Sequence, residues 1–274
     1  RAQVNDPSDQ VVCNGEATSA VTFATTNTDG VTTYSWTNSA PGIGLAASGI
    51  NDIGSFTAVN TGTEPVTATI TVTPHYEYLS EICDGPSQTF TITVNPTAQV
   101  NDPADQIVCN GTAVSTITFG TVNTGGLTTY SWTNTAPEIG LAALGTGNIS
   151  SFMALNGGTT HIVATIVVTP HFTNGLHTCD GPPETFTITV SPTAQVNDPT
   201  DQVVCNGSAT TAVVFSTNNT TGTTTYSWTN STPGIGLAAS GTGDIASFTA
   251  INTGNSPVTA TITVTPTVAY GTES

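Results

Sequence analysis

Five cysteines are the residues of this 274-residue chain whose spacing points most clearly to chemistry. Cys13 and Cys83 lie 70 positions apart, and Cys109 and Cys179 have the same separation. Neither pair is a CxxC redox motif, and two cysteines without a shared histidine spacing make a weak metal set. The spacing therefore predicts the disulfides Cys13–Cys83 and Cys109–Cys179, each stabilising its domain by about 4 kcal/mol. Lasting disulfides indicate an oxidising compartment, extracellular or periplasmic.

Cys205 has no mate in the sequence. By the same spacing its partner falls at position 275, whereas the sequence printed here ends at Ser274. The strand that corresponds to Gln88–Val94 is also missing from this last part of the chain. We therefore expect an incomplete final repeat with an unpaired edge, which is completed by further chain or by a strand from a neighbouring copy.

An acidic patch recurs along the chain and could bind a cation. It runs from Asn5 to Asp9 and comes back one and two periods later. Calcium prefers several carboxylate and carbonyl oxygens, so a calcium site near the domain junctions is one hypothesis. The alternative is a simple turn in which Asp9 caps a backbone amide. The six aspartates concerned are Asp6, Asp9, Asp102, Asp105, Asp198 and Asp201.

Catalytic residues are poorly represented. Of the four histidines only His75 and His171 occupy equivalent positions, and Thr267 stands at the third. No serine lies in a GxSxG or SxxK motif, and without lysine no Schiff base can form. A repeated enzyme would need its catalytic set repeated, so we expect no enzyme and no cofactor other than the calcium candidate.

The charge balance excludes two classes of partner. The only basic residue, Arg1, stands against 18 acidic ones, for a net charge of −17. Such a chain cannot neutralise phosphates, which excludes nucleic acids and anionic membranes as partners. No apolar run approaches the roughly 18 residues that a membrane span needs, so we expect no membrane insertion.

A repeat of 96 residues organises the chain. The motif AQVNDP begins at Ala2, Ala98 and Ala194, and TTYSWTN recurs with the same period. A unit of this length matches a small domain rather than a solenoid repeat. The predicted domains are unit 1 (residues 1–96), unit 2 (97–192) and an incomplete unit 3 (193–274). Their links, Asn95–Val100 and Ser191–Val196, are short and contain proline, which favours units held end to end in a rod.

Within a unit, apolar residues alternate with threonine, which is the commonest residue of the chain. This period of two predicts strands with one buried face, so each unit should be an all-β, antiparallel β-sandwich. Tyr34 and Trp36 share a face of a central strand, and Trp36, Trp132 and Trp228 are the expected core anchors. In unit 1 the predicted strands are Val11–Cys13, Ala17–Ala24, Thr32–Asn38, Ile43–Ala47, Ser55–Asn60, Thr67–Thr73 and Thr89–Val94.

These motifs together resemble a known family. AQVNDPxDQxVCNG, YSWTN and TFTITV are similar to the PKD-like repeats of Bacteroidota cell-surface proteins, including SprB-like gliding-motility adhesins exported by type IX secretion. The resemblance covers essentially the whole chain, although the WDFGDG tail of a PKD aromatic strand is absent. It implies an immunoglobulin-like sandwich and a cell-surface location.

The function that we expect is structural: an extracellular stalk or filament of a bacterial surface adhesin, which extends and withstands pulling. Its partners would be further repeats of the same chain or neighbouring copies in a filament. The alternative is an array of carbohydrate-binding modules on a secreted protein, which would bind surface glycans. Such modules need exposed aromatic side chains, and Tyr76, Tyr78 and Phe172 are the candidates outside the apolar alternation.

Overall fold

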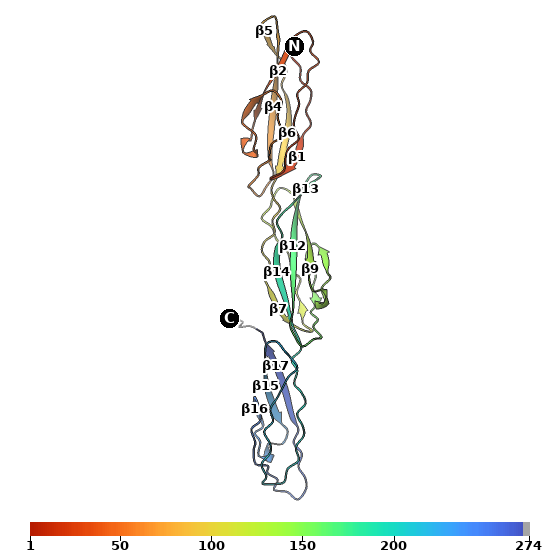
Figure 1. Cartoon of the computed structure of the whole chain (residues 1–274), viewed down its shortest axis with the longest axis vertical. Coiled ribbons are helices and arrows are strands. Elements are labelled where there is room, and N and C mark those ends of the chain that lie inside the picture. Colours follow the sequence, from red (N-terminus) through yellow and green to blue (C-terminus); the bar gives the residue numbers. More distant parts are fainter. Residues whose placement is uncertain (271–274) are drawn as a thin grey trace.

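The computed structural model describes residues 1–270 and shows three units stacked end to end in one extended rod (Figure 1). Strands β1 to β6 lie at the end that carries the N-terminus, β7 to β14 in the middle and β15 to β17 at the far end. Regular structure is strand or short 3-10 turn throughout, which confirms the all-β prediction. Among the described residues, no helix has the length or apolarity to cross a membrane.

One six-stranded sheet forms the body of unit 1, in the order β1-β6-β4-β2-β3, with β5 paired to the outer part of β4. Threonine alternation produces its long strands, and Ala68, Ile70 and Val72 on β4 are completely buried. The pairings are antiparallel except that β1 runs parallel to β6. The elements are β1 (Gln10–Cys13), β2 (Val31–Asn38), η1 (Pro41–Ile43), β3 (Ser48–Ile50), β4 (Val66–Tyr78), β5 (Glu81–Asp84) and β6 (Gln88–Asn95).

Unit 2 repeats this sheet in the order β10-β9-β12-β14-β7, with β13 paired to β12. A separate two-stranded sheet, β8 with β11, lies in the opposite layer. The elements are β7 (Gln106–Cys109), β8 (Ala113–Val114), β9 (Leu127–Asn134), η2 (Pro137–Ile139), β10 (Leu144–Thr146), β11 (Phe152–Met153), β12 (Ile162–Asn174), β13 (His177–Asp180) and β14 (Glu184–Ser191).

Unit 3 has three strands in its described part, in the order β16-β15-β17. Its core holds three buried apolar residues, whereas unit 2 has 17. Val204 is 41% exposed, although its equivalent in unit 1, Val12, is only 9% exposed. Within residues 1–270, β17 pairs with β15 alone, so one side of its backbone is an open edge. The elements are β15 (Thr223–Asn230), η3 (Pro233–Ile235), β16 (Ser240–Thr242) and β17 (Ile262–Ala269).

The layer that faces the main sheet is less regular than predicted. Ala17–Ala24 and Ser55–Asn60 are not strands and make only isolated bridges, Ala17 with Thr57 and Val21 with Ile53. The prediction of a strand at Ile43–Ala47 was wrong, because Pro41 begins a 3-10 turn that ends at Gly44 in the left-handed region (φ 97°). Apolar alternation predicts which face is buried, but these short segments lack a partner strand along their length.

Each tryptophan anchors its unit as predicted. Trp36, Trp132 and Trp228 are 7% exposed, and each ring covers the glycine that faces it on the neighbouring strand. A methyl group on Gly49 would lie 2.2 Å from the Trp36 ring, so only glycine fits there. Tyr34 shares this core, and burial, reinforced by Asp52, raises the pKa of its hydroxyl above the usual range.

Candidate functional site: the junctions between units

The two junctions contain the same main-chain hydrogen bond. The Thr124 amide of unit 2 donates to the Thr63 carbonyl of unit 1 across 2.9 Å. One period later the Thr220 amide of unit 3 donates to the Thr159 carbonyl of unit 2 across 3.0 Å. Because the bond recurs at equivalent positions, the way in which one unit sits on the next is a property of the repeat.

An asparagine fastens each link to the unit that follows it. The Asn123 side chain accepts the Gln99 amide at 2.7 Å and donates to the Thr97 carbonyl at 3.1 Å. Asn219 makes the same two contacts one period later, at 2.8 and 3.1 Å. These bonds give the links Asn95–Val100 and Ser191–Val196 fixed partners, so the links are not free hinges.

A second asparagine ties each link to the unit that precedes it. Asn14 donates to the Thr97 hydroxyl at 3.0 Å and accepts the Asn60 amide at 2.8 Å. Asn110 repeats both contacts at the next junction, at 3.0 and 2.7 Å. Each link is therefore held from both sides by side chains that the repeat supplies.

The junction between units 1 and 2 also contains a disulfide that the sequence analysis assigned differently. Cys13 bonds Cys179 with an S–S distance of 1.99 Å and a Cα–Cα distance of 5.6 Å. The predicted pairs Cys13–Cys83 and Cys109–Cys179 were therefore wrong. Cys13 ends β1 at the bottom of unit 1, whereas Cys83 lies on the β4–β5 hairpin at the opposite end of the same unit (Figure 1). Equal spacing in both units reflected the repeat and not a contact.

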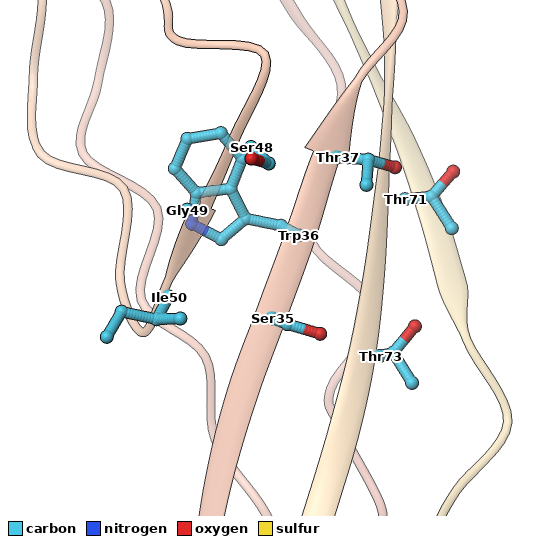
Figure 2. A pocket seen from close by; sticks show the side chains of 8 residues that line it. All are labelled: Ser35, Trp36, Thr37, Ser48, Gly49, Ile50, Thr71 and Thr73. Carbon is cyan, nitrogen blue, oxygen red and sulfur yellow. The ribbon is translucent and has the colours of Figure 1, made fainter.

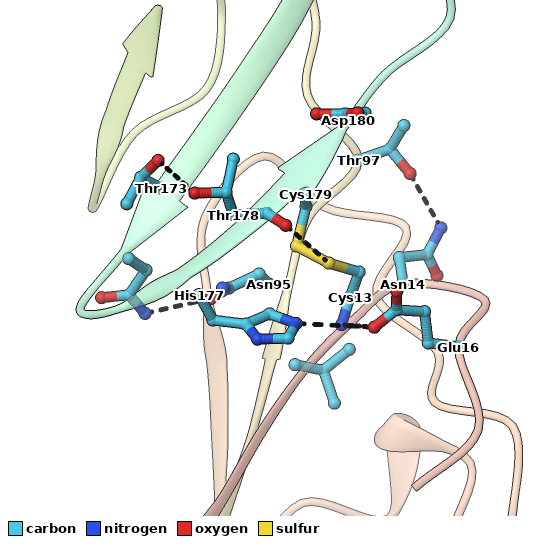
Figure 3. The surroundings of a disulfide bond; sticks show 12 residues. Cys13, Asn14, Glu16, Asn95, Thr97, Thr173, His177, Thr178, Cys179 and Asp180 are labelled. Atoms are coloured by element: carbon cyan, nitrogen blue, oxygen red, sulfur yellow. Dashed lines mark hydrogen bonds and ion pairs between the residues drawn. A yellow bond between two sulfur atoms is a disulfide. The ribbon is translucent and has the colours of Figure 1, made fainter.

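Polar contacts surround this disulfide (Figure 3). Asn174 donates to the Asn95 side chain at 3.0 Å, and the Cys13 amide donates to a Glu16 oxygen at 3.0 Å. His177 Nε2 lies 3.5 Å from the same Glu16 carboxylate, which makes an ion pair when the imidazole is protonated. The β12–β13 hairpin of unit 2 therefore contacts unit 1 on both sides of the bond.

Three cysteines remain free and exposed: Cys83, Cys109 and Cys205. Within residues 1–270 the only group of three or more potential metal ligands is Cys13, His177 and Cys179. Both cysteines of that group are oxidised in the disulfide, so neither offers a thiolate.

Serine, histidine and aspartate side chains form a hydrogen-bonded series that was not predicted from the sequence. Ser35 Oγ lies 2.8 Å from His75 Nε2, and His75 Nδ1 lies 2.6 Å from an Asp84 oxygen. Unit 2 repeats both distances with Ser131, His171 and Asp180. The signal was present in the sequence, because the spacings of 40 and 9 residues are the same in both units.

This arrangement has the order of a serine hydrolase triad but lacks its surroundings. Ser35 lies on β2 between β3 and β4, and the strand pairings occupy the backbone amides on both sides. The amides of β2 around Ser35 are therefore engaged in the sheet and do not stabilise an oxyanion, the interaction that usually contributes most to the rate of acyl transfer. The role that the geometry supports is mechanical: the three side chains join β2, β4 and β5, and the set in unit 2 holds the strand that carries Cys179.

The aspartates proposed for calcium form no group of three with other acidic, histidine or cysteine side chains in the described part of the chain. Asp9 accepts the Thr91 amide of β6 at 2.6 Å, and Asp105 accepts the Thr187 amide of β14 at 2.6 Å. Both contacts match the alternative in which the aspartate caps a backbone amide. Asp6, Asp102, Asp198 and Asp201 belong to no group of three acidic, histidine or cysteine side chains within the described residues. Calcium binding stays a prediction.

One hollow on the surface of unit 1 is lined in part by Ser35. This hollow, shown in Figure 2, lies along β2 and β3, and its lining is mostly hydroxyl groups around Trp36. No carboxylate or imidazole lines it. Its lining residues are Ser35, Trp36, Thr37, Ser48, Gly49, Ile50, Thr71 and Thr73.

The fold and the junctions define the class of this protein: a tandem array of all-β units with ordered joints. Among solved structures, the chain is similar to mouse cadherin-23 EC22–24, with 14% identity, TM-score 0.42 and coverage of 90% of this chain and 86% of that chain. It is also similar to the titin I9–I11 tandem, with 10% identity, TM-score 0.31 and coverages of 97% and 95%. No family model and no curated protein matches the chain.

Proposed function

We propose that this chain is a structural region of an extracellular protein, a stalk or filament that extends and withstands pulling. The observation that carries the proposal is the repetition of the joint. The same amide, asparagine and threonine contacts fix both junctions. A covalent bond crosses the first junction. A protein built to project a distant part needs such joints, whereas flexible linkers would suffice for independent modules.

The carbohydrate-binding alternative has less support. Phe172 is fully buried, and Trp36 in the hollow of Figure 2 is 7% exposed. Tyr78 is half exposed, but Asn174 replaces it at the equivalent position of unit 2. Sugar-binding sites present aromatic faces to solvent, and no such strip recurs on the described units. We therefore favour the structural role.

For the setting, we propose the surface of a bacterial cell, in an adhesin of the SprB-like type that is exported by type IX secretion. The motif resemblance suggests this family, and the disulfide suits an oxidising environment. A net charge of −17 keeps neighbouring molecules apart unless specific contacts join them.

The open edge of β17 suggests what completes the sheet of unit 3. In unit 2 the equivalent strand β12 pairs with β14, whose Phe186, Ile188 and Val190 complete the core. We propose that a strand of the same sequence type fills this place in unit 3, supplied by further chain or by a neighbouring copy.

Stretching single molecules tests the mechanical role. A pull on both ends cannot extend the chain between Cys13 and Cys179 while their bond is intact. Reduction should therefore add roughly 600 Å of contour length, the span of about 166 extended residues. Small-angle scattering should show a rod in solution. A compact particle or a freely jointed necklace would contradict the proposed function, whatever the stretching experiment shows.

A further inference from the structure

We propose that Cys83, Cys109 and Cys205 each form an inter-unit disulfide of the kind that joins Cys13 to Cys179. The partner of each is a cysteine of another copy of this repeat unit, stacked on the end of the unit that carries it. The leading cysteines are Cys13, Cys109 and Cys205, and the hairpin cysteines are Cys83 and Cys179. The rule is that the leading cysteine of one unit bonds the hairpin cysteine of the unit that follows. This pairing rests on the junction alone and is independent of the mechanical role.

The sequence separation of the observed bond gives the rule its register. Cys13 and Cys179 are 166 residues apart, which is one repeat period plus the 70-residue spacing within a unit. Under the same rule Cys109 pairs with a hairpin cysteine at position 275. Cys205 pairs with the hairpin of a unit after that, and Cys83 pairs with the leading cysteine of a unit before unit 1.

The hairpin that carries Cys83 in unit 1 has the same structure as the hairpin that carries Cys179 in unit 2. Tyr76 and Cys83 face each other across β4 and β5, as Phe172 and Cys179 do across β12 and β13. The serine, histidine and aspartate chain that includes Asp84 holds this hairpin with the same distances as in unit 2. Yet Cys83 is exposed, whereas Cys179 is only 2% exposed. The difference is the unit that covers the hairpin.

The leading cysteine of unit 2, Cys109, lies at the same position in its sheet as Cys13 does in unit 1. Cys109 ends β7 in register with Ser191, as Cys13 ends β1 in register with Asn95. The next residue, Asn110, makes the junction contact with Thr193 that Asn14 makes with Thr97. Cys109 is nevertheless exposed, whereas Cys13 is 8% exposed. Among the described residues, no hairpin of unit 3 reaches it.

Charge indicates which end fits the hairpin of unit 1. In the observed junction His177 faces Glu16 at 3.5 Å. Unit 1 carries Glu81 at the position of His177, so a leading end with Glu16 would place two carboxylates together. Thr112 and Ser208 stand at the position of Glu16 in units 2 and 3, and both are neutral. The leading end of unit 2 is already covered by unit 3 of its own chain. The end that fits the hairpin of unit 1 is therefore that of unit 3 in another copy, which would join Cys205 of one chain to Cys83 of the next.

Bond formation is an ordinary oxidation. Two thiols lose two protons and two electrons and form one S–S bond. A small disulfide such as oxidised glutathione accepts the electrons and leaves as two thiols. Exposed cysteines are accessible to this exchange.

The test extends the full chain after Ser274 with a copy of residues 179–192, which adds one hairpin cysteine and the missing strand. Dilute protein is oxidised in a glutathione buffer, and free thiols are counted after denaturation. In the Cys109→Ser variant the proposal predicts three free thiols, those of Cys83, Cys205 and the added cysteine. Pairing of Cys205 with the added cysteine within unit 3 would leave only the Cys83 thiol free. With Cys205→Ser the expectations reverse, to one and three. Peptic digestion at acid pH, which suppresses exchange, then identifies the pair in the unsubstituted extension.

A bond between the added cysteine and Cys205, or an added cysteine that stays free in a folded chain, would overturn the proposal. A second arm concentrates the extended protein and distinguishes the source of the partner. Covalent oligomers linked through Cys83 and Cys205, and abolished by Cys83→Ser, identify separate copies as partners. Monomers whose Cys109 is bonded to the added cysteine identify later units of the same chain. Cys83–Cys83 or Cys109–Cys109 links would contradict the register.

Discussion

The two junctions share a main-chain bond and the asparagine contacts of the links, but they differ in reinforcement. Between units 1 and 2, the hairpin of unit 2 adds a disulfide and the contacts of Asn174 and His177. Between units 2 and 3, the His161 and Tyr270 rings meet edge to face at 5.6 Å, and the Tyr270 hydroxyl lies 3.4 Å from that of Thr221. The link residues set the geometry of a joint, while the hairpin supplies its covalent strength.

The largest expected effect is the loss of the disulfide. The bond closes a loop of about 166 residues, so Cys13→Ser should destabilise units 1 and 2 by about 5 kcal/mol on the chain-entropy model. Differential scanning calorimetry would measure this loss. Cys109→Ser, which removes an unbonded cysteine from the equivalent position, is the matched control and should change stability by about 0.5 kcal/mol at most. Equal effects would show that the bond does not form in solution.

The next largest expected effect is a difference in amide hydrogen exchange between the sheets of units 2 and 3. Backbone amides near Trp228 should exchange hydrogen about 100-fold faster than those near Trp132. The reason is that unit 3 lacks the apolar burial of a β14 equivalent in its described part, worth about 3 kcal/mol. Hydrogen exchange with mass spectrometry measures this ratio, and the extension after Ser274 should reduce it. Equal protection in the original chain would mean that three strands already make a complete unit.

A smaller effect concerns the links. Asn219→Ala removes two hydrogen bonds to the link, worth about 1 kcal/mol each, and one from the Thr217 hydroxyl, at a junction that has no disulfide in the described part of the chain. Small-angle scattering should then show a broader distribution of overall lengths. Asn123→Ala removes the equivalent bonds, and a further 3.4 Å bond to the Thr63 carbonyl, beside the disulfide; it should still change the distribution less, because the disulfide holds this junction. Asn218→Ala, at an exposed neighbouring position, is the control for composition.

The smallest effect concerns the serine, histidine and aspartate chain of unit 2. Ser131→Ala should loosen the hairpin of Cys179 by about 1 kcal/mol and speed reduction of the disulfide by dithiothreitol about fivefold. Ser35→Ala alters the equivalent hairpin of the free Cys83 and should leave the rate unchanged. Neither serine should react with a fluorophosphonate, because the strand amides beside each serine are already paired in the sheet. Labelling of Ser35 or Ser131 would contradict a purely mechanical role and would indicate a nucleophilic serine.

Much of the fold could be predicted from periodicity. Alternating threonine predicted β4 and β6, and the shared face of Tyr34 and Trp36 predicted the core. These predictions succeeded because an inward-facing position in a strand must be apolar whatever lies opposite. Ile43–Ala47 failed because Pro41 imposes a turn that hydrophobicity does not reveal. The parallel pairing of β1 with β6 also has no signature in one strand alone.

The candidate site divides along the same line. The sequence by itself determined the period, the all-β class and the equivalence of the cysteines, because these follow from the spacing of residues along the chain. The tertiary structure alone decided that Cys13 faces Cys179 and that Ser35, His75 and Asp84 touch. The two cysteines of unit 1 lie at its opposite ends, and stacking places the leading cysteine Cys13 beside Cys179, the hairpin cysteine of the next unit. Spacing cannot tell a partner within a unit from the same residue one unit further along, and only the stacking of the units resolves that choice.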